Sequence, residues 1–181
     1  MRIAVVLAAL VTAVLVSACG VAPTRPIQHN AADVTFAQNM IPHHQQAVDM
    51  AAMVPSHTGN RNVIVMAKHI SADQQSGIDT LRQLLEQWRE PIGHDHDGHG
   101  GMGIDGMVDA ATMNKLQSLK GDAFDELWLR SMIRHHKGAI TMATTEMTNG
   151  EDPTAMKMAK MIVDWQQIEI GRMNALVGPL E

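Results

Sequence analysis

The sequence of 181 residues has little of several residue types on which many functions depend. It has one cysteine, no tyrosine, three tryptophans and two phenylalanines. A single cysteine cannot form an internal disulfide, and it leaves too few thiols for a thiolate metal site. Basic residues are also few, since 14 Lys and Arg stand against 19 Asp and Glu. A net charge of −5 without a basic cluster argues against binding to nucleic acid or to anionic lipid.

The first 18 residues have the pattern of a secretory signal peptide. Arg2 precedes an apolar run over residues 3–16, which is shorter than the ~20 residues of a membrane-spanning helix. The residues before Cys19 are similar to a bacterial lipobox, in which the cysteine becomes the acylated first residue of the mature protein. We therefore expect a lipoprotein signal peptide over 1–18 and a lipid anchor, with acyl chains such as palmitate, at Cys19. The alternative is an ordinary cleaved signal with a chance cysteine.

One segment occurs twice in the chain, at an offset of 92 residues. Residues 40–51 share seven of twelve identities with residues 132–143, including two histidines and two methionines. Weaker matches at the same offset continue through the residues that follow, which indicates a duplicated helical hairpin. One such hairpin cannot bury its apolar face alone, whereas two packed together form a four-helix bundle. We call two positions that lie 92 residues apart equivalent.

Apolar residues at helical spacing predict four helices, and no segment alternates with the period of a strand. The first helix is expected to begin at Asp33 or Thr35 and to end before Pro55, and the second to span residues 62–89. The third is expected to begin near Asp109, with a short lead-in, or near Asp122. The last is expected to begin at Pro153 and to run to about residue 177.

The predicted organisation is a flexible tether over residues 19–32 and one all-α domain over 33–181. Within this domain, repeats over 33–90 and 110–181 flank a linker over 91–109 that is rich in glycine and histidine. This linker is long enough to cross the whole bundle.

The repeated segment carries histidine and methionine at helical spacing. Met40 precedes His43 and His44 by three and four residues, so the three side chains share one helix face. The second copy repeats this arrangement in Met132, His135 and His136. Both histidine pairs fall near the middle of their helices, which predicts four imidazoles at mid-bundle with thioethers beside them. Imidazole binds Zn, Cu, Ni and Fe, and thioether favours Cu(I).

A second interpretation of these histidines needs no metal. A buried neutral imidazole requires one donor and one acceptor partner. The pairs could bond each other, buried water or nearby glutamines. The glutamines concerned are Gln74, Gln75, Gln166 and Gln167.

The linker contains a second candidate metal site. Histidine-rich glycine tracts bind late transition metals because a flexible backbone lets the ligands converge. The candidate ligands are His94, His96, His99 and Met102. The alternative is a solvated linker that binds nothing.

With both His-His segments and the phenylalanines that precede them, Phe36 and Phe124, the chain resembles the family catalogued as domain of unknown function 305. The resemblance covers about residues 33–178. It implies a ferritin-like four-helix fold, export from the cytoplasm and, for some members, an association with copper. The copper association is carried over to Met40, His43, His44, Met50, Met132, His135, His136 and Met142.

The resemblance to ferritins does not extend to di-iron chemistry. Di-iron bundles need Glu and Glu-x-x-His ligands from the helices, and the carboxylates here are not equivalent in the two repeats. Asp49 aligns with Thr141, Glu169 with Gly77 and Glu146 with Val54.

The sequence thus predicts a lipoprotein on the extracytoplasmic face of the bacterial cell envelope that binds copper, as Cu(I), for buffering, storage or transfer. Another late transition metal is an alternative cargo. The alternative function is a non-catalytic helical module that binds an envelope partner and whose histidines only satisfy core polarity. A metal-dependent oxidoreductase is a third hypothesis, and no catalytic residues are predicted.

Overall fold

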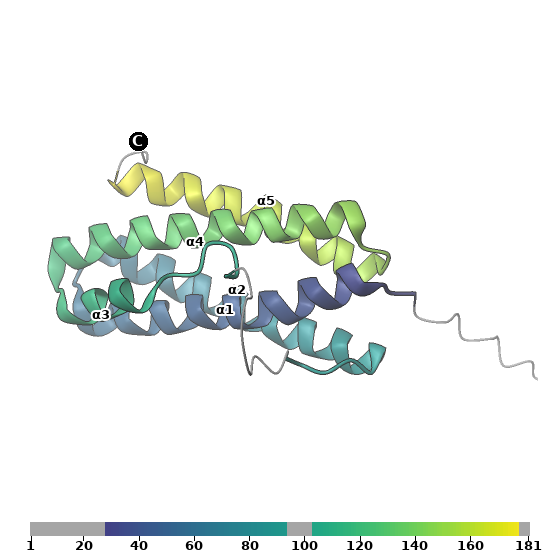
Figure 1. Ribbon diagram of the computed structural model, residues 1–181. Coiled ribbons are helices and arrows are strands. Elements are labelled where there is room, and N and C mark those ends of the chain that lie inside the picture. Colours follow the sequence, from purple (N-terminus) through teal and green to yellow (C-terminus); the bar gives the residue numbers. More distant parts are fainter. Residues whose placement is uncertain (1–27, 94–102, 178–181) are drawn as a thin grey trace, which may run out of the picture.

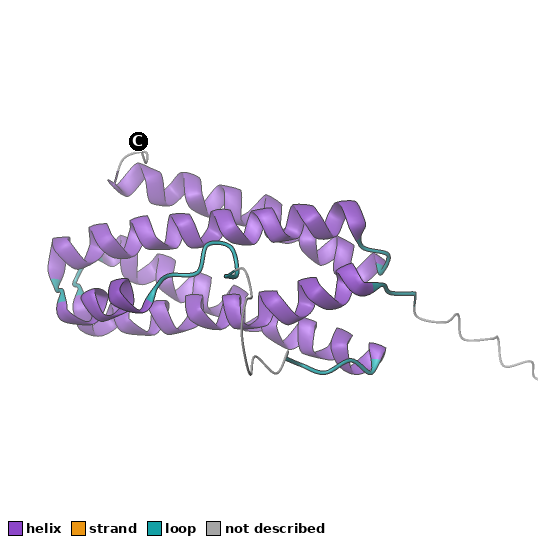
Figure 2. Ribbon diagram, in the orientation of Figure 1, coloured by secondary structure: helices purple, strands orange, loops and turns teal. Residues whose placement is uncertain are grey.

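The computed structural model describes residues 28–93 and 103–177, and these form five α-helices without any strand (Figures 1 and 2). The long helices are α1 (Ala31–His57), α2 (Arg61–Trp88), α4 (Gly121–Asn149) and α5 (Pro153–Val177). The short helix α3 (Ala110–Ser118) lies at one end of the bundle. The predicted all-α four-helix bundle is confirmed.

The two repeats form two helical hairpins that meet through their first helices. α1 packs along α2, and α4 packs along α5. The start of α1 lies beside the end of α4, since the Asn30 side-chain amide donates to the Asn149 carbonyl at 2.8 Å. At the other end of α1, the His57 ring lies 4.8 Å from the Phe124 ring near the start of α4. α1 and α4 are therefore antiparallel.

A pseudo-twofold axis relates the hairpins and passes between His43 and His135. These residues occupy equivalent positions, and their ring centroids are 3.7 Å apart. When a twofold axis relates two antiparallel helices, a residue that contacts its own equivalent must lie beside that axis. The duplication inferred from sequence therefore places this one histidine contact at the centre of the molecule.

The apolar core is divided into two clusters, one at each end of the bundle. Equivalent residues lie in opposite clusters: Met40 and Ile78 are in one, and Met132 and Ile170 are in the other. Between the clusters lies a layer of buried polar side chains. We call this the histidine layer, and it consists of His43, His44, Gln74, His135, His136 and Gln166.

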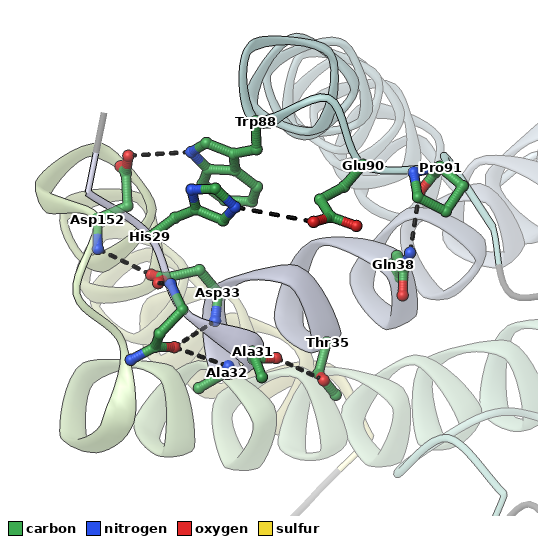
Figure 3. A network of polar contacts seen from close by, with 11 residues as sticks. His29, Ala31, Ala32, Asp33, Thr35, Gln38, Trp88, Glu90, Pro91 and Asp152 are labelled. Atoms are coloured by element: carbon green, nitrogen blue, oxygen red, sulfur yellow. Dashed lines mark hydrogen bonds and ion pairs between the residues drawn. The ribbon is translucent and has the colours of Figure 1, made fainter. Parts of the chain in front are cut away.

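The start of α1 is fastened to the turn between α4 and α5 (Figure 3). Asn30 caps α1 by accepting from the Asp33 backbone N–H, and the Asp33 carboxylate accepts in return from the Asn30 N–H. The same carboxylate accepts from the Asp152 backbone N–H at 2.9 Å. Asp152 in turn accepts from the Trp88 indole at 3.2 Å, so the ends of α1, α2 and α5 are joined.

Several helix boundaries differ from the prediction. α1 begins at Ala31 because Asn30, not Asp33 or Thr35, is the capping residue. It also continues through Pro55 to His57, since a proline in the last turn removes only one backbone hydrogen bond. Both proposed starts of the third helix occur, because α3 follows an Asp109 cap and α4 begins separately at Gly121.

The linker between α2 and α3 connects opposite ends of the bundle, as predicted. α2 ends beside Asp152, whereas α3 lies at the opposite end, where its Gln117 carbonyl contacts His57 Nε2 at 3.1 Å. The predicted signal peptide, Cys19 and the linker ligands at 94, 96, 99 and 102 lie outside the described residues.

No helix in the described ranges is long and apolar enough to cross a membrane.

Candidate metal-binding site

All four histidines of the repeated segments are buried at mid-bundle. His43 and His136 are 0% exposed, His135 is 1% exposed and His44 is 2% exposed. The prediction that both pairs lie inside the bundle is therefore met by their positions. Their neighbours along the bundle are the two apolar clusters.

The central contact is the pair His43 and His135. Their rings are tilted by 31°, and none of their four ring nitrogens has a hydrogen-bond partner among the described residues. Each ring is farther from its neighbour in sequence, at 6.4 Å for His43 and His44 and 6.3 Å for His135 and His136. A buried polar atom without a partner costs about 1–3 kcal/mol. The folded protein therefore bears this cost in free energy at the ring nitrogens of His43 and His135.

Burial lowers the pKa of His43, His44 and His135 and so keeps these three imidazoles neutral at neutral pH. Burial, followed by the nearby charge of His136, lowers the pKa of His43 to about 4. The backbones of Asp105 and His135 act in the opposite direction, although neither forms a hydrogen bond with the His43 ring. Burial, followed by the charges of His43 and His136, lowers the pKa of His44 to about 3. Neutral imidazole is the form that binds metal ions.

The pKa of His135 is lowered in the same way. Burial is the main cause, and the charges of His43, His136 and His44 add to it. At neutral pH the central pair is therefore uncharged and able to offer nitrogen lone pairs.

The outer histidines are not held alike. His136 Nε2 lies 2.8 Å from a carboxylate oxygen of Glu169 on α5. His44 has no such partner, because the position equivalent to Glu169 is Gly77. The repeat alignment pairs Glu169 with Gly77. It does not reveal the contact between Glu169 and His136, because that contact depends on the packing of α4 against α5.

Methionines flank the histidine layer on both sides. Met40 and Met132 are 0% exposed and lie one helical turn before their histidine pairs. Met50 and Met142 lie about two turns after the histidines, roughly 10 Å along the helix axis, and both pack among apolar side chains. Their role as ligands stays a prediction.

Among the described residues, direct hydrogen bonds between the histidines and the glutamines, one form of the alternative, are absent. Gln74 and Gln166 are buried, but neither donates to or accepts from a histidine, and both amide oxygens lack partners. Gln75 and Gln167 are exposed. Nor do any three His, Cys, Asp or Glu side chains of the described ranges converge into a preformed metal site. A cation at the central pair would therefore rest on imidazole and thioether.

The end of the linker covers one side of the central pair. Gln46 on α1 both donates to the Val108 carbonyl at 2.8 Å and accepts from its N–H at 2.7 Å. A Cβ at Gly138 on α4 would collide with the Asp105 backbone, and Gly106 has a φ of +80° in the same contact. The linker thus closes the α1–α4 seam on the side away from α2 and α5 (Figure 1).

A cavity of about 570 Å³ lies on the other side, between α2 and α5. Its walls include His44, Gln74, Gln166 and Glu169, whereas the His136 ring lies behind Glu169 and does not line it. One face of the histidine layer is therefore covered by the linker, and the other is reached through this cavity.

Comparison with known families identifies the chain. The family model of the domain of unknown function DUF305 matches residues 33–177. The chain belongs to the DUF305 family. This confirms the resemblance drawn from the twin His-His segments. A comparison with curated proteins gave no significant match.

Solved structures of DUF305 proteins have the same fold. A protein from Streptomyces coelicolor that is described as secreted is 32% identical, with a TM-score of 0.74 over 80% of this chain and 89% of that one. A fragment from Deinococcus radiodurans is 29% identical, with a TM-score of 0.73 over 83% of this chain and 98% of that one.

The protein CopM is a further structural relative of this chain. In its Cu(II)-bound form it is 31% identical, with a TM-score of 0.70 over 80% of this chain and 95% of CopM. CopM has also been solved with Cu(I), with silver and without metal.

Proposed function

We propose that this DUF305 protein is exported and binds copper, as Cu(I), in the histidine layer. The observation that carries the proposal is the contact between His43 and His135. Two buried, neutral imidazoles meet on the pseudo-twofold axis, and their four ring nitrogens have no protein partner. A metal ion at this point would use nitrogen lone pairs that accept no hydrogen bond from the described residues.

The chemistry of the surrounding donors favours a soft cation. Met40 and Met132 supply thioethers beside the pair, and thioether with imidazole is a donor set that suits Cu(I). In their neutral form His43 and His135 do not repel a cation at neutral pH. Copper is here the cargo of the protein, which fits buffering, storage or transfer and requires no catalytic residue.

The relatives support the same cargo. CopM binds Cu(I), Cu(II) and silver in solved structures, and this chain matches it over most of its length. The relative from Streptomyces coelicolor, which is described as secreted, supports export. We further propose that Cys19 carries a lipid anchor. Mass spectrometry of the mature N-terminus, with acylated Cys19 as the expected first residue, tests this part separately.

The decisive test of copper binding is the double substitution His43→Ala and His135→Ala. Removal of both imidazoles should weaken Cu(I) binding by at least about 100-fold, because a factor of ten in affinity corresponds to about 1.4 kcal/mol and each imidazole ligand is expected to contribute at least this much. A competition titration with a Cu(I) chelator measures the affinity, and circular dichroism checks that the helices remain. His69→Ala, at an exposed histidine on α2, is the matched control. Unchanged affinity and stoichiometry in the double variant would rule the proposal out.

A second candidate function is partner binding, favoured by exposed apolar side chains on α5. Met161 is 50% exposed, Trp165 60% and Ile168 46%. Side chains of this size on one helix are typical of protein interaction sites. A specific envelope partner that is captured by wild-type protein without metal, and is not captured by the Trp165→Ser variant, would favour this function.

A further inference from the structure

The two halves of the histidine layer differ at the equivalent positions 77 and 169. In the second repeat, the Glu169 side chain fills the space beside His136 and accepts from its Nε2 at 2.8 Å. In the first repeat, a Cβ at Gly77 would come within 2.7 Å of His44 Cδ2 and 2.9 Å of its Nε2. Because glycine has no side chain, the Nε2 edge of the buried His44 ring packs directly against α2 at Gly77, and both residues line the cavity.

His44 forms part of the cavity wall with two buried amides. His44 is 2% exposed, Gln74 3% and Gln166 4%, and each has a buried side-chain atom without a hydrogen-bond partner. All three line the space between α2 and α5. The unpartnered atoms are Nδ1 of His44 and the side-chain oxygens of Gln74 and Gln166. Buried polar atoms without a protein partner indicate that water or an ion completes their interactions.

The end of a methionine side chain approaches the same point from the opposite wall. The Met158 methyl group lies 3.4 Å from the Cβ position of Gly77, the point that His44 Nε2 approaches to 2.9 Å. Met158 is on α5, and it lines the cavity together with Met161. The His44 Nε2 and the methyl end of the Met158 thioether thus approach the same point, where the first repeat lacks a side chain.

We propose that His44 and Met158 form a second site, distinct from the central pair, that takes a monovalent soft cation from the α2–α5 cavity. This inference rests on the proposed copper function and specifies the side on which Cu(I) enters. Thioether discriminates against hard divalent ions, which prefer oxygen ligands. In the second repeat Glu169 occupies the corresponding space, so the duplication does not give this site a twin.

The position of this site implies that an ion binds there before it reaches the central pair. One side of the central pair is covered by residues 104–108 of the linker, and the cavity on the other side reaches His44 first. A cation held by His44 and Met158 is then one residue along α1 from His43. Uptake by the central pair should accordingly be slower when the cavity site is removed.

The test compares Met158→Leu with Met66→Leu in the full chain. Position 66 is equivalent to 158, and leucine conserves the volume of both side chains while removing the sulfur. Silver(I), which does not change oxidation state, is titrated into protein labelled with ¹³C at the methionine methyl groups. We expect the Met158 methyl signal to shift on addition of silver, and Met158→Leu to bind one equivalent fewer. Met66→Leu should retain the wild-type stoichiometry.

Gly77→Glu provides an independent test, because it gives His44 the partner that His136 already has. This variant should lose the same equivalent of silver and should load the central pair at least about tenfold more slowly in stopped-flow measurements. If Gly77→Glu does not fold, Met158→Leu alone decides.

An unshifted Met158 methyl signal, or equal silver stoichiometry in wild type and Met158→Leu, overturns the cavity site while leaving copper binding at His43 and His135 intact. Wild-type protein that binds neither silver nor Cu(I) overturns both proposals together.

Discussion

The two hairpins of this protein share one plan, yet they treat equivalent histidines differently. His136 is held by the carboxylate of Glu169, whereas His44 faces Gly77 and a cavity. A second difference lies near one end of the bundle, where Glu146 is buried at the position equivalent to Val54. Duplication thus supplied a symmetric frame, and single side chains then made the chemistry of its two halves different.

The largest effect on stability is expected for Glu146→Gln. It removes the ionisable group from a buried position whose equivalent, Val54, is apolar. Burial, together with the neighbouring Asp33, raises the pKa of Glu146 to about 8. The folded state therefore holds this carboxyl protonated, and its contribution to stability is present below the unfolded pKa near 4.5 and disappears as pH rises to about 8. The glutamine variant cannot ionise and should be more stable than wild type by on the order of 2 kcal/mol at pH 8.

Thermal unfolding of both proteins between about pH 4 and pH 9 measures this difference. It should vanish below about pH 4.5, where the carboxyl is protonated in both states. A difference that does not depend on pH would show that Glu146 is ionised in the folded protein.

An intermediate effect is expected for Gly77→Ala, which fills the space that distinguishes the first repeat. The new Cβ would contact the buried His44 ring, and crowding of this kind costs about 1–3 kcal/mol. This exceeds the gain of about 1 kcal/mol that alanine brings to a helix. The variant should therefore unfold at lower denaturant concentration than wild type.

Gly171→Ala on α5 is the matched control for this substitution. No atom lies within 4 Å of a Cβ there, so this variant should be more stable by up to about 1 kcal/mol. Equal stabilisation by both alanines would show that His44 moves aside freely and that the close approach at Gly77 is without consequence.

The smallest effect is expected for Glu169→Gln, which keeps the shape of the second repeat but removes its charge. A hydrogen bond to a charged group contributes about 1 kcal/mol more than a neutral one, so the decrease in stability should be of that order. Because a carboxylate only accepts, Nε2 of wild-type His136 should carry a proton in ¹⁵N spectra without metal. Glutamine can donate or accept, so Nε2 should carry a proton in only part of the molecules of the variant, and an unchanged Nε2 signal would contradict the contact.

The sequence by itself determined much of this architecture. The offset of 92 residues between two Met-x-x-His-His segments predicted the duplicated hairpins, the burial of both histidine pairs and the family, because helical periodicity and repetition are local properties of the chain. The predicted stop at Pro55 was wrong, since the pattern shows which residue disfavours a helix but not whether packing offsets the cost of one absent hydrogen bond.

Only the tertiary structure decided which histidines meet. An antiparallel arrangement of α1 and α4 brings His43 onto His135, and it separates His44 and His136 toward different partners. The distance between side chains on different helices depends on the direction and offset with which the helices pack. Spacing along one helix carries no information about either, so the cavity between α2 and α5, the Met158 contact and the role of Glu169 arise from packing alone.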